Sequence, residues 1–323
     1  MTQPLTFGIY IANAGPFSTP ELIRDLADEA ERRGFDGCWT NEHPMPVKDV
    51  VGYKWPTKHH YIPHFDVDTT LAYIAGRTKR VRLGCSIHVL PYHNGIWLAK
   101  TVATLDQLSD GRAILGIGVG WNEQEARFLG FNDFADRGKY TDESLDVIKK
   151  LWTEEYPGFT GRWYDFEPVD WRPKPVQKPH PPIWIGGESN PAMRRVAKYG
   201  TGWLLSHMPL EWLRENIPAC RERMKALGRD PAELREVGCF YNVKLLKNGQ
   251  RISKVVDDRK TMAGNWMEGP AEAFVEDLKQ FNEAGLTYPI LRIYAENHDD
   301  VLKQLRIFDE EVRPHVAPST ASS

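Results

Sequence analysis

The sequence predicts a single α/β domain, a (β/α)8 barrel with insertions after strands 2, 4 and 7. Short apolar segments alternate with amphipathic segments along the chain, which indicates a parallel sheet built from βα units. Eight such units can be counted in the 323 residues, a normal length for one barrel of this class. A doubly wound open sheet would alternate in the same way, but no linker separates two halves. We therefore predict the closed barrel, over residues 1–316.

The predicted elements begin and end at local signals. In the first helix, Thr19 is a typical N-cap, Pro20 takes the first helical position and Gly34 ends the helix. The predicted strands are 7–11, 37–40, 81–87, 112–117, 183–185, 202–205, 238–246 and 289–294. The predicted helices are 20–33, one that begins at residue 68, then 96–108, 123–128, 140–152, 191–198, 210–227, 271–283 and 300–311.

Three longer segments interrupt the alternation. Residues 44–65 contain several Pro and His residues, and residues 153–182 are rich in Pro and aromatic side chains and have room for short strands. Residues 247–269 are long and polar, which suits a mobile lid over the barrel mouth and equally a disordered surface loop. The small, polar residues 317–323 predict a disordered tail.

Composition narrows the range of functions. The net charge is −3 with both signs mixed along the chain, so nucleic acid is not an expected partner. The cysteines Cys38, Cys85, Cys220 and Cys239 are widely spaced and form no CxxC pair, so we expect reduced thiols and a cytoplasmic protein. We expect neither a secretory leader nor a membrane span, because no stretch approaches roughly 18 apolar residues.

Catalytic groups of such a barrel lie just after the strands, at the carboxyl ends. After the second strand, Glu42 and His43 are followed by Pro44 and are placed to face a substrate, although a turn with a hydrogen-bonded His would have the same composition. After the third strand, residues 84–93 contain Gly and small side chains. These suit a bulge or the close approach of backbone to a flat ligand, but taken alone they favour a plain buried strand.

Glycines follow the fourth and fifth strands. Gly116, Gly118 and Gly120 have the spacing GxGxG, not the GxGxxG of a dinucleotide fingerprint, and we interpret them as sites where backbone approaches a ligand. Gly186 and Gly187 precede a helix that Pro191 opens. This arrangement predicts a phosphate site more readily than a merely capped helix, because free N–H groups and the helix dipole point outward there.

Two other classes of chemistry have little support. His59, His60 and His64 do not have the spacing of HExxH or of a typical zinc site, so we predict a structural or surface role for them and no metal. No GxSxG elbow or compact triad is present, which argues against hydrolase chemistry.

At these strand ends the sequence closely resembles the luciferase-like flavin oxidoreductases. Residues 99–112 match the block AK-x-x-ATLD-x-LS-x-GR of that family, and the other matching blocks are 83–92, 115–121, 173–177 and 181–187. The resemblance runs from about residue 5 to residue 205 and extends to the C-terminal third only in organisation. Residues 53–65 and 90–92 are similar to a branch usually assigned to the deazaflavin coenzyme F420.

The resemblance implies several site residues. A non-prolyl cis peptide would fall at Ser86-Ile87 and support the cofactor ring from behind. Glu42 matches an acidic position near the ring, and His43 matches a substrate-contacting His of the sugar-phosphate dehydrogenase branch. The remaining implied cofactor contacts are Gln124 and the phosphate turn, which comprises Trp184, Ile185, Gly186 and Gly187.

Two departures affect the substrate side. Trp121 stands where the sugar-phosphate dehydrogenases carry a catalytic Glu, so that substrate is not expected, and we count Trp121 with Glu42 and His43 as a candidate catalytic residue. His93-Asn94 replaces the Arg-x-Pro commonly found in the family.

The predicted function is hydride transfer between F420 and a small organic substrate, with His43 as acid or base. An alternative is an FMNH2-dependent two-component monooxygenase that receives flavin from a reductase; its oxygen chemistry needs a dry pocket. The tryptophans available to line such a pocket are Trp39, Trp97, Trp121 and Trp184. A second alternative is a flavin-binding protein without catalysis. The resemblance also implies a homodimer formed through barrel helices.

Overall fold

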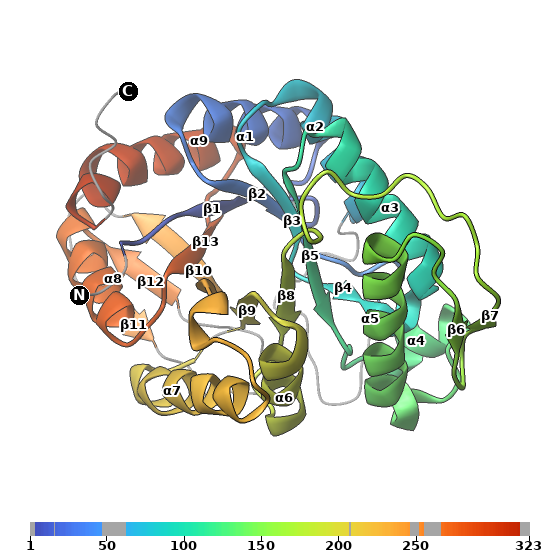
Figure 1. The fold of residues 1–323 in the computed structure, drawn as a ribbon. Coiled ribbons are helices and arrows are strands. Elements are labelled where there is room, and N and C mark those ends of the chain that lie inside the picture. The colour runs from blue at the N-terminus through green and yellow to red at the C-terminus, as the bar shows by residue number, and fades with distance from the viewer. Residues whose placement is uncertain are drawn as a thin grey trace.

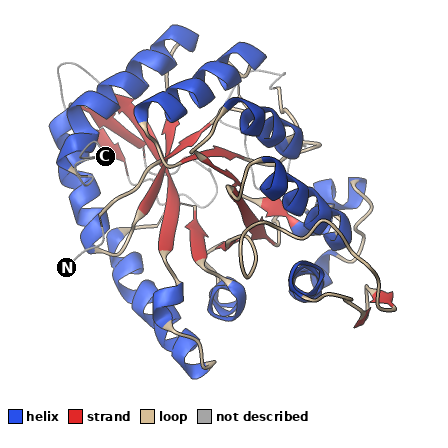
Figure 2. Cartoon of the chain, turned by 45° about the horizontal axis from the view of Figure 1, so that its top comes forward, coloured by secondary structure: helices blue, strands red, loops and turns tan. Residues whose placement is uncertain are grey.

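The computed structural model describes residues 4–15, 17–46, 63–206, 208–245, 252–254 and 266–316. Eight parallel strands close into a barrel ringed by helices, as predicted (Figures 1 and 2). The strands, in barrel order, are β1 (Gly8–Tyr10), β2 (Gly37–Thr40), β3 (Arg82–Cys85), β5 (Ala113–Gly118), β8 (Ile183–Gly186), β9 (Gly202–Leu205), β10 (Glu236–Leu245) and β13 (Tyr288–Ile293). Parallel pairing of β13 with β1 closes the ring.

The helices that cover this barrel are α1 (Pro20–Arg33), α2 (Val67–Arg77), α3 (Gly95–Leu108), α5 (Arg137–Thr153), α6 (Asn190–Tyr199), α7 (Leu210–Ala226), α8 (Ala271–Glu283) and α9 (His298–Ile307). The first helix shows how local sequence sets their bounds. The Thr19 hydroxyl accepts a hydrogen bond from Leu22 N at 3.2 Å, and Gly34 ends the helix with φ 67°.

The insertions contain the remaining elements. The short helix α4 (Glu123–Phe128) follows β5, and β6 (Phe159–Thr160) and β7 (Asp165–Phe166) form a hairpin within the predicted excursion 153–182. After β10, the strands β11 (Ile252–Lys254) and β12 (Trp266–Gly269) extend the sheet, with β12 parallel to β10. The predicted lid 247–269 otherwise lies outside the described residues, as does the predicted tail 317–323.

Two predicted elements differ from the structure. The third strand, predicted over 81–87, ends at Cys85, and the chain pairs again as β4 (His88–Val89), which lies beside β5. The last helix, predicted over 300–311, is α-helical only to Ile307 and continues as a π-helical turn over Phe308–Val312. In both places the chain continues in the same direction but its backbone hydrogen-bond pattern changes. The periodicity of apolar residues in the sequence does not predict such a change.

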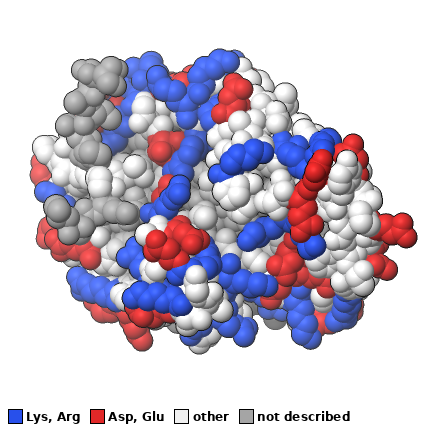
Figure 3. Space-filling model, viewed as in Figure 1, with Lys and Arg blue, Asp and Glu red and all other residues white. Residues whose placement is uncertain are grey.

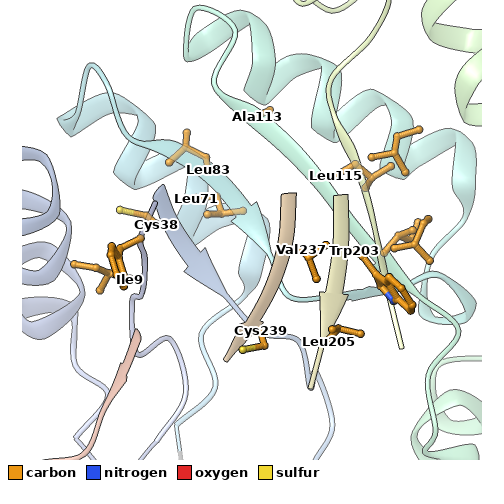
Figure 4. Close-up of a cluster of buried hydrophobic side chains, with 14 of the residues drawn as sticks. Ile9, Cys38, Leu71, Leu83, Ala113, Leu115, Trp203, Leu205, Val237 and Cys239 are labelled. Carbon is orange, nitrogen blue, oxygen red and sulfur yellow. The ribbon is translucent and has the colours of Figure 1, made fainter. Parts of the chain in front are cut away.

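The main core lies between the strands and the helices. Side chains at alternate strand positions point outward, so that Cys38 and Leu83 pack beside Leu71 of α2 (Figure 4). All four cysteines are buried free thiols, as the sequence predicts. On the outer surface, acidic and basic side chains are interspersed across the face shown in Figure 3.

A second, smaller cluster fills the inside of the barrel. Trp39, Trp184 and Tyr288 are buried here, with the two indole rings 4.9 Å apart. Arg82, at the start of β3, lies over the Trp184 and Tyr288 rings and pairs with Asp36 at 2.5 Å. The amino-terminal end of the barrel is therefore closed by stacked rings and ion pairs, and only the carboxyl end remains for a ligand.

One glycine inside the barrel gives a direct test of this packing. A Cβ added to Gly116 would collide with the carbonyl oxygen of Cys85, a backbone atom that cannot rotate away. Gly116→Ala should lower the free energy of unfolding by about 2–4 kcal/mol, measured by urea denaturation. Gly76→Ala is the control, because no atom lies within 4 Å of its added Cβ; this helical substitution should be neutral or stabilise by up to ~1 kcal/mol. Equal effects of the two substitutions would contradict this account.

Candidate active site

The carboxyl end of the barrel is organised around Ile87. The Ser86–Ile87 peptide is cis, at the position that the resemblance implied. The Ile87 side chain is half-buried and packs against the cluster inside the barrel. An added Cβ at Gly118 would collide with Ile87 Cδ1, and one at Gly186 would lie 2.8 Å from Ile87 Cγ2. The ends of β3, β5 and β8 therefore meet at this one side chain.

This contact changes the interpretation of the GxGxG segment. The sequence predicted that Gly116 and Gly118 let the backbone approach a ligand. In the structure, the space beside Gly118 holds Ile87 and the space beside Gly116 holds the Cys85 carbonyl group. The glycines therefore accommodate the chain's own bulge, and a ligand would lie against Ile87 rather than against the glycines.

The glycine turn after β8 leads into the capped amino terminus of α6. Gly187 adopts φ 110°, and its N–H donates to Leu204 O at 3.0 Å. Ser189 Oγ accepts from Ala192 N at 3.3 Å and so caps α6. The nearby carboxylate of Glu188 is turned away by Ser206, whose N–H and hydroxyl bind it at 2.5 and 2.6 Å. The turn and Ile87 are neighbours, which a cofactor with a ring and a phosphate tail requires.

Two residues predicted for this turn lie elsewhere. Trp184 is 0% exposed and belongs to the ring cluster at the closed end of the barrel, and Ile185 is 1% exposed and points outward to the helices. Their side chains therefore do not reach a cofactor at the turn, and only their backbone is placed to do so. The glycine and proline residues predict the position of the turn, but they do not predict the directions in which the side chains of the preceding strand point.

The predicted dry pocket of four tryptophans is not formed. Trp39 and Trp184 are buried at the closed end, and Trp97 is 72% exposed on the outer face of α3. Trp121 alone of the four is near the mouth, 43% exposed, with its ring 6.0 Å from the ring of His43. Gln124 is half-buried on the following helix α4. Trp121 and Gln124 are therefore placed beside the mouth, and their roles stay predictions.

His43 lies in the mouth and is held by a buried carboxylate. Its Nδ1 is 2.9 Å from Oε2 of Glu125, a residue that is 0% exposed. The Tyr92 hydroxyl donates to the same oxygen at 3.0 Å, and Met45 N donates to Oε1 at 3.0 Å. Burial alone would raise the pKa of Glu125, but the hydrogen bonds and the charge of His43 outweigh it and lower that pKa. Glu125 is thus an ionised carboxylate that fixes the orientation of the imidazole.

Glu42 is buried and both of its carboxylate oxygens have hydrogen-bond partners. Its carboxylate accepts from Val89 N at 2.7 Å and contacts His93 Nε2 at 2.7 Å, and the residue is 6% exposed. Both oxygens are therefore committed to the segment that follows Ile87. These bonds are suited to positioning that segment, and the catalytic role of Glu42 stays a prediction.

A second buried pair lies behind the bulge. His88 is 1% exposed; its Nε2 is 3.0 Å from Asp68 Oδ1 and its Nδ1 is 3.2 Å from the Gly116 carbonyl oxygen. Both ring nitrogens face acceptors, so the doubly protonated imidazolium satisfies both. Burial would lower the pKa of His88, but Asp68 and the other acceptors outweigh it and raise the pKa to about 9. The pKa of Asp68 is correspondingly lowered, against the effect of its own burial.

Sequence analysis missed Glu125, Asp68, His88 and the buried Asn13. Asn13 joins the first two loops: its side chain donates to Asn41 O at 2.8 Å and accepts from Asn41 N at 2.9 Å. Asn122 and Glu125 have the spacing of a helix cap, which conceals that the Glu125 side chain turns inward. The other partners are far apart in sequence, and only barrel closure brings them together.

The metal prediction is tested only in part. Among the described residues, no group of three or more His, Cys, Asp or Glu side chains is arranged to hold a metal ion. His64 lies with its ring 6.1 Å from that of His43, whereas His59 and His60 lie outside the described residues. No helix in the described part of the chain is both long and apolar enough to cross a membrane.

The structure is thus a closed barrel with buried ionic pairs and a glycine turn at its carboxyl end. Residues 6–243 match the family described as Luciferase-like monooxygenase, and the chain belongs to that family. It is 31% identical over 237 residues to an F420-dependent glucose-6-phosphate dehydrogenase of Kineococcus radiotolerans, covering 72% of this chain and 66% of that relative. The chain thus spans about two thirds of that relative's length.

Two further comparisons cover nearly the whole chain. An FMNH2-dependent dimethylsulfone monooxygenase of Pseudomonas putida is 24% identical, over 98% of this chain and 96% of that relative. The crystal structure of monooxygenase RslO1 from Streptomyces bottropensis superposes with a TM-score of 0.78 at 24% identity, covering 97% of this chain and all of that one, which supports the fold. The protein is therefore an F420- or flavin-dependent oxidoreductase of the luciferase-like family.

The His88–Asp68 pair predicts how stability depends on pH. The folded pKa of about 9 lies above the ordinary value of 6.5, so the stabilisation is complete below about pH 6.5 and is lost as the pH rises through 9. Across that window His88 should contribute a decrease on the order of 3 kcal/mol in the free energy of unfolding, measured by urea denaturation. His88→Gln and Asp68→Asn should both flatten this decrease. A variant curve parallel to the wild-type curve would remove the pair as its cause.

Proposed function

We propose that this protein transfers a hydride between coenzyme F420 and a small organic substrate at the carboxyl end of its barrel. The observation that carries the proposal is the placement of His43, held by the buried Glu125, in the same mouth as Ile87 and the glycine turn. The F420-dependent relative at 31% identity supports F420 over FMN. We do not carry over the substrate in that relative's name, because Trp121 stands where a catalytic Glu is expected in sugar-phosphate dehydrogenases.

The residues present fit such a cofactor. Gly186 and Gly187 leave the phosphate turn without side chains, and the capped amino terminus of α6 favours negative charge there. Ile87 offers an apolar surface to one face of a flat ring. When bound, the deazaflavin would supply the hydride chemistry, and the protein would supply position and charge.

His43 would move the proton that a hydride transfer leaves unbalanced. An imidazole can donate or accept a proton near neutral pH, which suits either direction of reaction. Because Nδ1 is bound to Glu125, the exchange with substrate would use Nε2. Glu125 acts through His43 and is a positioning residue, in the way that a buried carboxylate orients an imidazole in other enzymes.

Substitutions can separate the proposed proton transfer by His43 from the proposed positioning role of Glu125. His43→Ala should lower kcat by about a hundredfold or more in any oxidation or reduction that the protein supports, and cofactor affinity should stay the same. Glu125→Gln keeps the shape but removes the charge, and should lower kcat by roughly tenfold to a hundredfold with little change in KM. Tyr92→Phe is the matched control, because it removes one hydrogen bond to Glu125 and keeps the carboxylate. An unchanged kcat in His43→Ala would remove His43 from the mechanism.

The cofactor assignment can be measured directly. Native mass spectrometry of the purified protein with F420 and FMN offered together should show F420 as the bound species. Bound FMN with no F420 would favour the alternative, an FMNH2-dependent monooxygenase supplied by a separate reductase, which the dimethylsulfone monooxygenase relative supports. Against that alternative, three of the four tryptophans predicted to line a dry pocket lie elsewhere, and the fourth, Trp121, is 43% exposed.

We also propose a homodimer formed through α2 and α3. Tyr73, Trp97 and Leu108 on these helices are 47%, 72% and 69% exposed, and a groove between the helices is lined by Trp97, Thr101 and Leu108. Large apolar side chains gathered on one face are typical of protein interfaces. The four buried thiols support the further proposal of a reducing, cytoplasmic location.

The interface proposal predicts a change of mass in solution. The wild-type protein should sediment as a dimer, and Trp97→Glu should sediment as a monomer because a charge in an apolar interface is not paired. Tyr156→Glu, a change at a residue that is 60% exposed in the 153–182 excursion, should leave the dimer intact. A monomeric wild type, or a dimeric Trp97→Glu variant, would contradict the assignment.

A further inference from the structure

Arg292 lies in the barrel mouth and has no polar partner in the part of the chain that the structure describes. It lies on β13, where Tyr288 and Ile290 point into the barrel, so by strand alternation Arg292 points inward one step nearer the carboxyl end. Its side chain is half-buried, and its Nε is buried without a hydrogen-bond acceptor. No hydrogen bond or ion pair joins its guanidinium to any described residue.

Aromatic rings hold the guanidinium in place. Its central carbon lies 4.8 Å from the centre of the Tyr10 ring and 4.3 Å from that of the Phe240 ring, and these rings pack edge to face at 5.8 Å. The Tyr10 hydroxyl donates to Asn41 Oδ1 at 2.8 Å, which fixes the ring. The rings attract the cation but accept none of its five N–H donors. The two rings therefore orient the charged group, but they do not provide acceptors for its N–H donors.

The carboxylates of the mouth do not supply these acceptors. Glu125 is bound to His43, Glu42 to His93 and Glu188 to Ser206. Each therefore has a partner other than Arg292. A buried N–H of a charged group without an acceptor is unfavourable, and a bound anion is one way to satisfy it.

Arg292 faces the position proposed for the cofactor ring. In the barrel order, β13 and β5 are four strands apart in either direction, so they stand on opposite sides of the ring of strands. Ile87 packs against Gly118 of β5. Ile87, Phe240 and Tyr10 also belong to one interior cluster, so Arg292 and Ile87 share one chamber. A ring resting on Ile87 would have its open face toward Arg292.

We propose that Arg292 binds an oxyanion, such as a carboxylate, on the substrate that reacts at this face. A guanidinium presents two parallel N–H groups to a carboxylate, and such bidentate bonds are strong and orienting. The substrate would then be held at one end by Arg292, with its reacting atom between the ring and His43. This proposal rests on the proposed function for the placement of the ring, and it names the substrate class as small organic anions.

The test compares a carboxylate with its neutral isostere on the cofactor-loaded protein. Benzoate and benzamide are titrated by calorimetry into wild type, Arg292→Met, Arg292→Lys and Arg77→Met. Arg292→Met keeps the length of the side chain without charge or donors, and Arg292→Lys keeps the charge without the fork. Arg77→Met is the matched control, because Arg77 stacks on Tyr73 at 5.7 Å and pairs with Asp28 on the outer surface.

Wild type and Arg77→Met should bind benzoate at least about tenfold more tightly than benzamide, because only benzoate gains a charge-assisted bidentate bond. Arg292→Met should lose that preference, and Arg292→Lys should keep part of it. A wild type without the preference, or an Arg292→Met variant that retains it, would overturn the proposal. If Arg292→Met does not fold, Arg292→Lys is compared with wild type instead. A reduced preference for benzoate then supports the proposal, and an unchanged preference overturns it.

A separate arm identifies the source of the oxyanion. Cofactor affinity is measured for wild type and Arg292→Met before the probes are added. Unchanged cofactor affinity with lost benzoate preference supports a substrate anion. Lost cofactor affinity with retained benzoate preference would assign Arg292 to the cofactor tail and overturn the substrate proposal. A wild type that binds FMN and not F420 would overturn the cofactor assignment alone, because the benzoate comparison is then made on the FMN-loaded protein.

Discussion

The insertion of Ile87 between β5 and β8 is the contact on which the rest of the mouth depends. Gly118 and Gly186 have no side chain at the points where Ile87 enters the barrel, so the two strands can approach it closely. Ile87 packs against the interior cluster that contains Trp39, Trp184 and Tyr288. The depth at which a flat ligand can rest is therefore set by one aliphatic residue, and the polar groups around the mouth are placed relative to it.

The charges at this end of the barrel fall into two groups. The carboxylates of Glu42, Glu125 and Asp68 are each hydrogen-bonded to a histidine, and the Glu42 and Asp68 pairs support the chain that follows Ile87. Such pairs hold backbone and imidazole in place because both partners are desolvated and satisfied. Arg292 is different, since among the described residues its guanidinium contacts the Tyr10 and Phe240 rings and has no hydrogen-bond acceptor. Among the described residues, the carboxylates of the mouth are therefore paired with histidines, whereas the guanidinium of Arg292 can bind an anion.

Much of the fold could be predicted because its signals are local. The strands at 37–40 and 202–205 and the helices at 123–128 and 271–283 have the predicted bounds, and Thr19 and Gly34 delimit the first helix as expected. The position of the glycine turn followed from its Gly-Gly and Pro191. The active-site pairs could not be predicted in this way: His43 and Glu125 are 82 residues apart, and His88 and Asp68 are 20 apart. Their contacts exist only after the barrel closes, and a single strand break after Cys85 decides which way His88 points.

The structure indicates the chemical class of the cofactor more directly than it distinguishes F420 from FMN. A deazaflavin and a flavin share a flat ring and a phosphate, and Ile87 and the glycine turn would contact those shared parts. Discrimination must come from what surrounds the reacting face. Hydride transfer moves one hydrogen nucleus together with two electrons, so the second hydrogen of such a redox step needs a separate proton carrier, and a substrate anion needs a cation to hold it. Oxygen chemistry needs exclusion of water instead. Among the described residues, the mouth has the imidazole of His43, oriented by Glu125, and the guanidinium of Arg292, whose Nε has no acceptor. Trp121, the tryptophan near the mouth, is 43% exposed and so does not exclude water. That balance of groups is the physical reason to prefer hydride transfer.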